Sequence, residues 1–208
     1  MIELPAEGLL FDSDGVLVDS DDAVETAWGQ WSRHWGLDPA EVTAQVHGAP
    51  SRQTVVRLIA EADRPQALRM IDRLELELVD GARALPGAAD LLASLQPGTW
   101  AIVTSGVGRL ARARLAAAGI PLPPVVVTAD DVSAGKPDPE PYLAAAAGLG
   151  RDPGGCLVFE DALAGVTSAR AAGVGYVVGV RRRNDGIDAF VPDLRSVTVE
   201  SGTVRLAV

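Results

Sequence analysis

The segment from Leu10 to Ser20 reads LFDSDGVLVDS, and it decides how the rest of the chain is interpreted. Its first residues are typical of a buried strand, which ends at two aspartates, Asp12 and Asp14, followed by Gly15. Beyond a strand end the backbone can turn so that a carboxylate and a neighbouring carbonyl group converge, and such oxygen ligands suit Mg²⁺. Asp, Ser and Gly are also common in turns, so this segment alone is compatible with either a metal site or a simple acidic turn.

The composition is that of a folded protein with an acidic surface. Of the 208 residues, 48% are hydrophobic, the mean hydropathy is +0.17 and the formal net charge is −10. A chain of this length buries a full core and holds one domain, or one domain with an insertion. Because an acidic surface repels nucleic acids and anionic membranes, neither is expected as a main partner.

The chain has a single cysteine, Cys156, so no disulfide can form within it. Its apolar neighbours favour a buried thiol over a nucleophile. The sequence shows no signal-peptide pattern, and no apolar stretch reaches the ~18 residues of a membrane span. We therefore expect a cytoplasmic protein, and a monomer, because no large apolar stripe is left over.

Between the first strand and about residue 83 the sequence predicts only helices. Their expected ranges are 21–35, 40–46, 51–60 and 65–79, with Ser51 as the N-cap of the third. In the first range Trp28, Trp31 and Trp35 recur at helical spacing. Such a stripe is most simply the buried face of a helix, and the alternative is an aromatic surface that stacks on a ligand.

From residue 86 onward, strands and helices alternate. Strands are expected over 100–103, 125–127, 157–159 and 176–180, and helices over 88–95, 108–118, 139–149 and 162–172. Apolar strands separated by helices predict an α/β fold, in which a parallel sheet is covered on both faces. The tail after Arg195 alternates weakly and is expected to form an edge hairpin that turns at Ser201 and Gly202.

Polar residues follow four of the predicted strands, at the edge where open parallel sheets bind ligands. One of them is Lys136, the only lysine beside seventeen arginines. Each residue alone is explained by a turn or a helix cap, whereas the occurrence of all of them at one edge of the sheet favours a functional site. The residues are Asp12, Asp14, Thr104, Lys136, Glu160 and Asp161.

These residue types suit phosphoryl transfer. The carboxylates can hold Mg²⁺, and Thr104 with the backbone amides of Ser105 and Gly106 stands at a helix start, where anions bind. Lys136 adds a compact positive charge where a planar guanidinium would not fit. A carboxylate nucleophile splits such a transfer into two steps, and the second aspartate, Asp14, can protonate the leaving oxygen and then activate water.

Four segments together resemble the motifs of the haloacid dehalogenase superfamily. They are DSDGVLVDS (12–20), IVTSG (102–106), GKPDP (135–139) and FEDALAGV (159–166). In order and spacing they are similar to the phosphatase and phosphomutase branch, which carries a helical cap inserted after the first motif. The resemblance covers nearly the whole chain. It implies a Rossmann-like core of residues 1–18 and 84–208 and a cap domain of residues 19–83, with hinges near 18–20 and 84–87.

The resemblance also implies a role for each matched acidic residue. Asp12 would be the nucleophile and a metal ligand. Asp14 would be the general acid and base, with its backbone carbonyl group on the metal. Asp161 would bind Mg²⁺, with Glu160 as a further ligand or as a residue behind the ligands. Asp19 also matches, and it is expected to be a hinge or cap residue.

The same resemblance covers the phosphate site and the cap. Thr104 would bind the transferring phosphoryl group, and Lys136 would steady both the phosphate and the nucleophile. The loop HGAPSR (47–52) resembles a substrate-specificity loop, with a His-Gly start similar to sugar-phosphate, deoxyglucose-phosphate and glycerol-phosphate phosphatases. His47, Gly48 and Arg52 are therefore candidate substrate-binding residues. The alternatives are that His47 only holds the loop together and that Arg52 is simply solvated.

The sequence thus predicts a Mg²⁺-dependent phosphatase that hydrolyses a small sugar or polyol phosphate through an aspartyl-phosphate on Asp12. The main alternative is a β-phosphoglucomutase-like enzyme. Such mutases resemble one another in a hinge histidine, and here that position is Val24, with no histidine between residues 20 and 30. A metal-free dehalogenase would not need Asp14. A non-catalytic binding protein on this fold would be expected to have lost one of the motif residues, and all are present.

Overall fold

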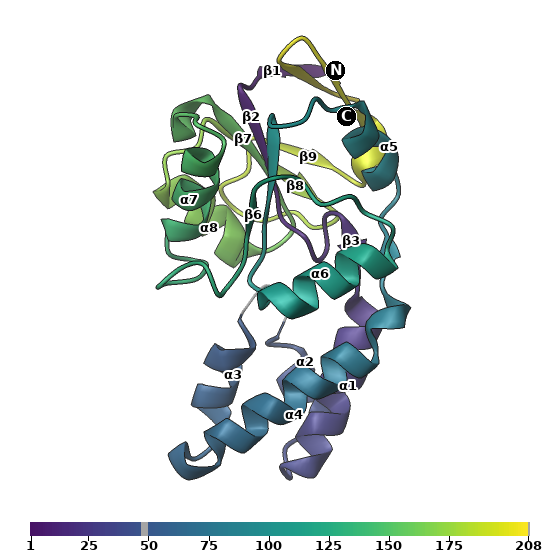
Figure 1. Ribbon diagram of the computed structural model, residues 1–208, viewed down its shortest axis with the longest axis vertical. Helices are drawn as coiled ribbons and strands as arrows, with labels where there is room; N and C mark the ends of the chain where they lie inside the picture. Colours follow the sequence, from purple (N-terminus) through teal and green to yellow (C-terminus); the bar gives the residue numbers. More distant parts are fainter. Residues whose placement is uncertain (47–49, 208) are drawn as a thin grey trace.

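A six-stranded parallel sheet forms the centre of the computed structural model, which describes residues 1–46 and 50–207 (Figure 1). The strand order is β6-β5-β2-β7-β8-β9, so β2, which precedes the two aspartates, lies in the middle of the sheet. The predicted parallel α/β sheet is confirmed, and the structure adds a short edge strand, β9, that the sequence did not predict. The strands are β2 (Gly8–Phe11), β5 (Trp100–Val103), β6 (Val126–Val127), β7 (Cys156–Glu160), β8 (Tyr176–Val180) and β9 (Ala189–Val191).

Helices cover both faces of this sheet. They are α5 (Ala88–Ser94), α6 (Gly108–Ala117), α7 (Glu140–Gly148) and α8 (Leu163–Ala171). α7 and α8 lie together on one face, α5 and α6 on the other, and α6 also lies next to the helices drawn below it (Figure 1). Side chains of a strand alternate between its faces. Leu9 and Phe11 therefore join the core under α5 and α6, while Leu10 joins the core under α7 and α8. Burial on both faces explains the unbroken apolar run of β2.

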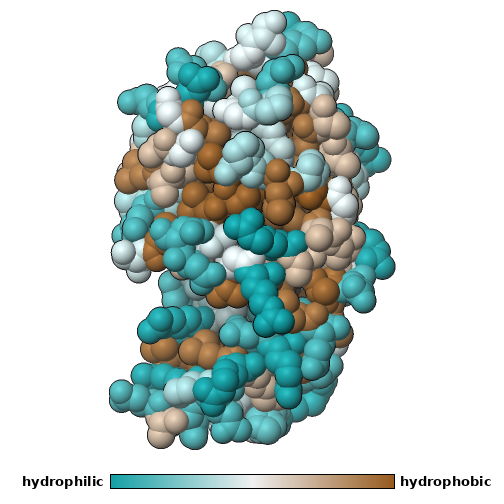
Figure 2. All heavy atoms as spheres, viewed as in Figure 1, coloured by the Kyte–Doolittle hydropathy of each residue, from teal (hydrophilic) through white to brown (hydrophobic). Residues whose placement is uncertain are grey.

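The described residues between 21 and 81, that is 21–46 and 50–81, form a helical layer below the sheet (Figure 1). The layer has a hydrophobic core of its own, which includes Trp28 and Trp31, while its outer surface is mainly hydrophilic on the face shown in Figure 2. It consists of α1 (Asp21–His34), α2 (Pro39–Thr43), α3 (Ser51–Leu58), α4 (Arg64–Glu77) and the 3₁₀ turns Glu61–Asp63 and Val79–Gly81. The chain enters through β3 (Val18–Asp19) and leaves through β4 (Arg83–Ala84), and these strands pair antiparallel. Two adjacent crossings thus connect the layer to the sheet.

One local expectation is wrong. Ser51 does not cap α3: Pro50 occupies the N-cap position, Ser51 is the first helical residue, and no side chain bonds the first turn. The Ser51 hydroxyl instead donates to the Glu75 carboxylate on α4, at a long 3.5 Å. A contact with another helix has therefore replaced the local cap that the sequence pattern predicted.

The C-terminal tail forms the predicted hairpin, β10 (Val197–Glu200) and β11 (Thr203–Leu206). The sequence did not predict its partner, β1 (Ile2–Pro5), which pairs antiparallel with β11 and completes a separate three-stranded sheet. Alternate residues of these strands are buried against the main core, which fixes the register. Within the described part of the chain, no helix has the length and apolar character that crossing a membrane requires.

Trp31 gives a direct test of the helical layer. It is fully buried, its ring lies 5.0 Å from that of Trp28, and its Nε1 donates to the Ala67 carbonyl on α4 at 2.9 Å. We expect Trp31→Ala to lower the free energy of unfolding by about 3–5 kcal/mol, measured by urea denaturation. Trp35→Ala is the matched control: this tryptophan is only partly buried, and its loss should cost well under half as much. Equal losses would contradict the packing described here.

Candidate active site

Three strand ends meet at the ammonium group of Lys136. This lysine lies between β6 and α7 and is 3% exposed. Its Nζ donates to Asp12 Oδ1 at 2.6 Å, to Glu160 Oε1 at 2.6 Å and to the Val103 carbonyl at 3.0 Å. Asp12 follows β2, Val103 ends β5 and Glu160 ends β7. One cation thus links the ends of the central strands, as their parallel arrangement predicts.

The charges at this point are strongly coupled. Burial alone would lower the pKa of Lys136, but the adjacent Asp12 and Glu160 carboxylates outweigh it and raise that pKa well above its usual value. Lys136 therefore stays protonated. Burial raises the pKa of Asp12, Lys136 opposes the shift, and the Glu160 and Asp161 charges add to it. The site holds more negative charge than one lysine neutralises, so it favours a further cation.

Glu160 is saturated with hydrogen bonds. Its Oε1 accepts from Lys136 and from the Tyr142 hydroxyl at 2.9 Å, and its Oε2 accepts from the backbone N–H groups of Asp161 and Ala162. The Tyr142 ring also packs 5.1 Å from the Lys136 ammonium. A methyl group at Gly165 would collide with the Glu160 carboxylate. The surroundings therefore fix Glu160 as a buried anchor for Lys136.

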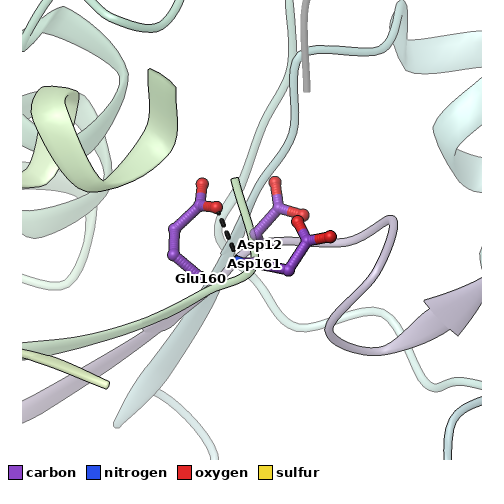
Figure 3. Close-up of side chains that lie close together, drawn as sticks. All are labelled: Asp12, Glu160 and Asp161. Atoms are coloured by element: carbon purple, nitrogen blue, oxygen red, sulfur yellow. Dashed lines mark hydrogen bonds between the residues drawn. The ribbon is translucent and has the colours of Figure 1, made fainter. Parts of the chain in front are cut away.

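Carboxylate oxygens of Asp12, Glu160 and Asp161 all lie within 4.8 Å of one another (Figure 3). Burial raises the pKa of Asp161 to about 7, the Glu160 charge adds to this shift, and Arg182 opposes it. Arg182 Nη1 lies 2.8 Å from Asp161 Oδ2, and Asn184 Nδ2 donates to the Asp161 carbonyl. Buried hard oxygen donors with surplus negative charge fit a divalent cation such as Mg²⁺.

Asp14 lies in the turn after β2 and lines a cavity between the sheet and the helical layer. Its Oδ1 accepts from the Ser20 hydroxyl at 2.6 Å and from Arg114 Nη1 at 3.3 Å. Both donors bond the same oxygen, Oδ1, so neither of these two hydrogen bonds engages Oδ2. Gly15, the next residue, has φ +90° and sits where a Cβ would collide with the Asp161 carboxylate. The turn that presents Asp14 therefore requires glycine.

The segment after β5 differs in one detail from the expectation. Thr104 is buried at the strand end and lines the cavity, as do Ser105 and Gly106. The Gly106 N–H donates to Thr104 Oγ1 at 3.1 Å, instead of facing the cavity unengaged. The Ser105 hydroxyl is buried and has no hydrogen-bond partner among the described residues. A polar group of this kind favours a polar ligand.

A cavity of about 710 Å³ lies between this edge of the sheet and the helical layer. Asp12, Asp14 and Lys136 line one side, while Arg52, from α3, and Trp28, from α1, line the other. The buried-face interpretation of the tryptophans is supported, although Trp28 also reaches the cavity wall. The other two candidate residues of the cap loop, His47 and Gly48, lie outside the described residues.

Sequence reasoning missed Arg114, Glu75, Tyr142 and Arg182, and the first two form a buried ion pair. Arg114 Nη2 lies 3.2 Å from Glu75 Oε1, and both side chains are almost fully buried. A signal was available in the helical periodicity. Arg114 follows buried Leu110 by four residues, and Glu75 follows buried Ile71 by four residues, so each interrupts an apolar stripe. Tyr142 and Arg182 gave no comparable signal.

Comparison with known proteins identifies the family of this chain. Residues 6–173 match the family model for haloacid dehalogenase-like hydrolases. The chain belongs to this family. Hexitol phosphatase A from Escherichia coli is 43% identical over 203 residues, covering 93% of this chain and 94% of that protein. The 2-deoxyglucose-6-phosphate phosphatase 1 of Saccharomyces cerevisiae is 32% identical, covering 96% and 92% of the two chains.

The solved structures agree with the family assignment. A hydrolase from Pseudomonas syringae superposes with a TM-score of 0.80 at 27% identity, covering 92% of this chain and 95% of that one. The predicted family, the α/β fold and the prediction of a phosphoric monoester hydrolase are all confirmed. The roles of individual residues remain predictions for this haloacid dehalogenase-like hydrolase.

Proposed function

We propose that this haloacid dehalogenase-like hydrolase cleaves the phosphate monoester of a sugar or polyol, with Mg²⁺ as cofactor and an aspartyl-phosphate on Asp12 as intermediate. The observation that carries the proposal is the cluster of Asp12, Asp161 and Lys136 at the carboxyl end of the central strands. It combines a nucleophile, oxygen donors for a metal and a fixed positive charge within one cavity.

We assign Asp12, Asp161 and the backbone carbonyl of Asp14 to the metal. When bound there, Mg²⁺ would neutralise charge on the phosphoryl oxygens. Glu160 has both oxygens engaged by four donors, so we assign it to holding Lys136 behind the metal site. Of the two alternatives for Glu160, these four hydrogen bonds support the role behind the metal ligands.

Two steps complete the reaction. Asp12 attacks phosphorus, the bond between phosphorus and the ester oxygen breaks, and Asp14 gives its proton to the departing alkoxide. Asp14 then takes a proton from water, which attacks phosphorus and releases inorganic phosphate, so that Asp12 is regenerated. Lys136 neutralises charge on Asp12 and on the phosphoryl group, and Thr104 and Ser105 bind the phosphoryl oxygens.

We propose that the helical layer is a cap domain of residues 19–83 on a core of residues 1–18 and 84–208. Two features support this division: the layer has its own hydrophobic core, and the backbone passes between the layer and the sheet at two adjacent points, β3 and β4. The cavity lies between the two parts, so a change in their separation would open or close it. Asp19, whose carboxylate lies 3.6 Å from Arg181 Nη1, is then a hinge residue.

The metal site gives a pH-dependent prediction. Because the pKa of Asp161 is raised to about 7, its carboxyl group carries a proton below that pH, and a metal ion must displace the proton. We expect the apparent affinity for Mg²⁺ to fall as the pH drops from about 8 to about 6. The increase in melting temperature that Mg²⁺ produces, titrated at each pH, measures this affinity. An affinity that does not change over this range would contradict the assignment of Asp161.

A panel of phosphate esters tests the proposed substrate class. We expect hexitol phosphates to be hydrolysed with the highest kcat/KM, ahead of 2-deoxyglucose 6-phosphate, glycerol phosphate and a nucleoside monophosphate. Two observations support this order: the similarity to hexitol phosphatase A, and the many polar side chains of the cavity wall, among them Arg52, Asp72, Glu75 and Arg114. A chelator should abolish release of phosphate from every ester. A preference for the nucleotide would overturn the assignment to sugar and polyol phosphates.

The mutase alternative has its own test. Val24 lines the cavity at the position where the mutases carry a hinge histidine. We expect no conversion of glucose 1-phosphate to glucose 6-phosphate, even with a hexose bisphosphate as primer. Conversion at a rate comparable to hydrolysis would replace the phosphatase assignment with the mutase one.

A further inference from the structure

Arg114 connects three parts of the molecule that are distant in sequence. It lies on α6, its side chain is 6% exposed, and its two terminal nitrogens contact different carboxylates. Nη1 lies 3.3 Å from Asp14 Oδ1, in the turn after β2, and Nη2 lies 3.2 Å from Glu75 Oε1, on α4 of the helical layer. The guanidinium therefore bridges the candidate proton donor and the helical layer.

Glu75 depends on this bridge. Its side chain is 5% exposed, and its only other side-chain hydrogen bond among the described residues is the long one from the Ser51 hydroxyl to Oε2. A buried carboxylate without a charged partner is strongly disfavoured. Any separation of the helical layer from α6 would break this pair, so that Glu75 would lose its charged partner while Arg114 kept only its contact with Asp14.

A single hydrogen bond does not fix the orientation of the Asp14 carboxylate. The Ser20 hydroxyl reaches Oδ1 alone, and about this single bond the carboxylate can still rotate. Arg114, on α6, donates to the same oxygen through Nη1. Its other terminal nitrogen, Nη2, donates to Glu75, which restrains the guanidinium group. With both contacts in place, Oδ1 is fixed and Oδ2 is the oxygen available for the proton.

We propose that Arg114 is a positioning residue that aligns the Asp14 carboxylate for proton transfer, and that it does so when Glu75 brings the helical layer against α6. The inference rests on the proposed function, because it takes Asp14 as the acid that protonates the leaving oxygen. It goes beyond that function by making proton donation depend on the closed position of the helical layer.

A series of aryl phosphates of similar shape and increasing leaving-group pKa, from p-nitrophenyl to phenyl phosphate, tests the inference. A good leaving group departs without a proton, whereas a poor one needs it. The slope of log kcat/KM against leaving-group pKa therefore reports proton donation, and kcat/KM includes only the steps up to attack by Asp12. We expect a shallow slope for the unmodified enzyme and a steep one for Asp14→Asn.

We expect Arg114→Met to steepen the slope as well. Its kcat/KM for phenyl phosphate should fall on the order of 10²-fold, and that for p-nitrophenyl phosphate by less than about tenfold. Glu75→Gln should give an intermediate slope. The double variant Arg114→Met with Glu75→Gln removes the unpaired charge, so it should regain melting temperature while its slope stays steep. Arg112→Met, an exposed arginine on the same helix, should match the unmodified enzyme.

The outcomes separate the inference from the function on which it rests. If Arg114→Met lowers kcat/KM for all esters by the same factor, Arg114 is only structural or only binds substrate, and the inference is wrong. If the double variant recovers both stability and the shallow slope, it is also wrong. If the slope of Asp14→Asn equals that of the unmodified enzyme, or if no phosphate ester is cleaved, the proposed function itself fails.

Discussion

Replacing Asp12 with asparagine is expected to lower kcat for phosphate release on the order of 10⁴-fold or more. Asparagine has nearly the same shape, but its amide is not a nucleophile and carries no charge for a metal ion. The same change removes one of three crowded buried carboxylates. Burial raises the pKa of Asp12 despite Lys136, so its charge is costly in the metal-free protein, and the variant should melt no lower than the unmodified protein.

Two controls make this result decisive. Asp22→Asn, at an exposed position in the first turn of α1, should retain full activity. The intact mass of the Asp12→Asn protein must be checked, because deamidation would restore the aspartate. Substantial activity in a preparation free of deamidated protein would remove Asp12 from the mechanism.

Replacing Lys136 is expected to produce the second largest effect, on both activity and stability. Lys136→Met preserves the stem but removes the ammonium from Asp12, Glu160 and the Val103 carbonyl. Glu160 then remains buried without its cation, which should cost about 3–5 kcal/mol of unfolding free energy. The loss of positive charge beside the phosphoryl group should lower kcat on the order of 10²–10³-fold.

A second substitution separates the two effects of losing Lys136. Glu160→Gln in the Lys136→Met background removes the unpaired charge, so it should recover much of the stability in urea denaturation but none of the activity. Lys136→Arg should also be impaired, because a planar guanidinium does not fit a 3% exposed site with acceptors at 2.6, 2.6 and 3.0 Å. An arginine variant as active and as stable as the unmodified protein would contradict this account of the site.

The sequence predicts best the residues that are placed by strand ends. Asp12, Thr104 and Lys136 follow apolar runs, and the parallel arrangement of those runs brings them to one edge without further information. The contact of Lys136 with both Asp12 and Glu160 is a consequence of that topology.

Contacts between distant helices were not predictable in the same way. The bridge from Arg114 to Glu75 depends on how α4 lies against α6, which local periodicity does not encode. Periodicity shows only that each residue interrupts an apolar stripe. For the same reason the Ser51 hydroxyl contacts Glu75 instead of capping α3, and β1 pairs with the C-terminal hairpin from the other end of the chain.

The most direct test of the central claim is to trap the phosphoryl-enzyme. The protein is mixed with a hexitol phosphate and Mg²⁺, quenched in acid within the first turnover, digested and analysed by mass spectrometry. We predict a phosphoryl group on the peptide that contains Asp12, lost on treatment with hydroxylamine and absent from the Asp12→Asn variant. Phosphate release without any phosphorylated Asp12 peptide, or a phosphoryl group on another residue, would contradict the account.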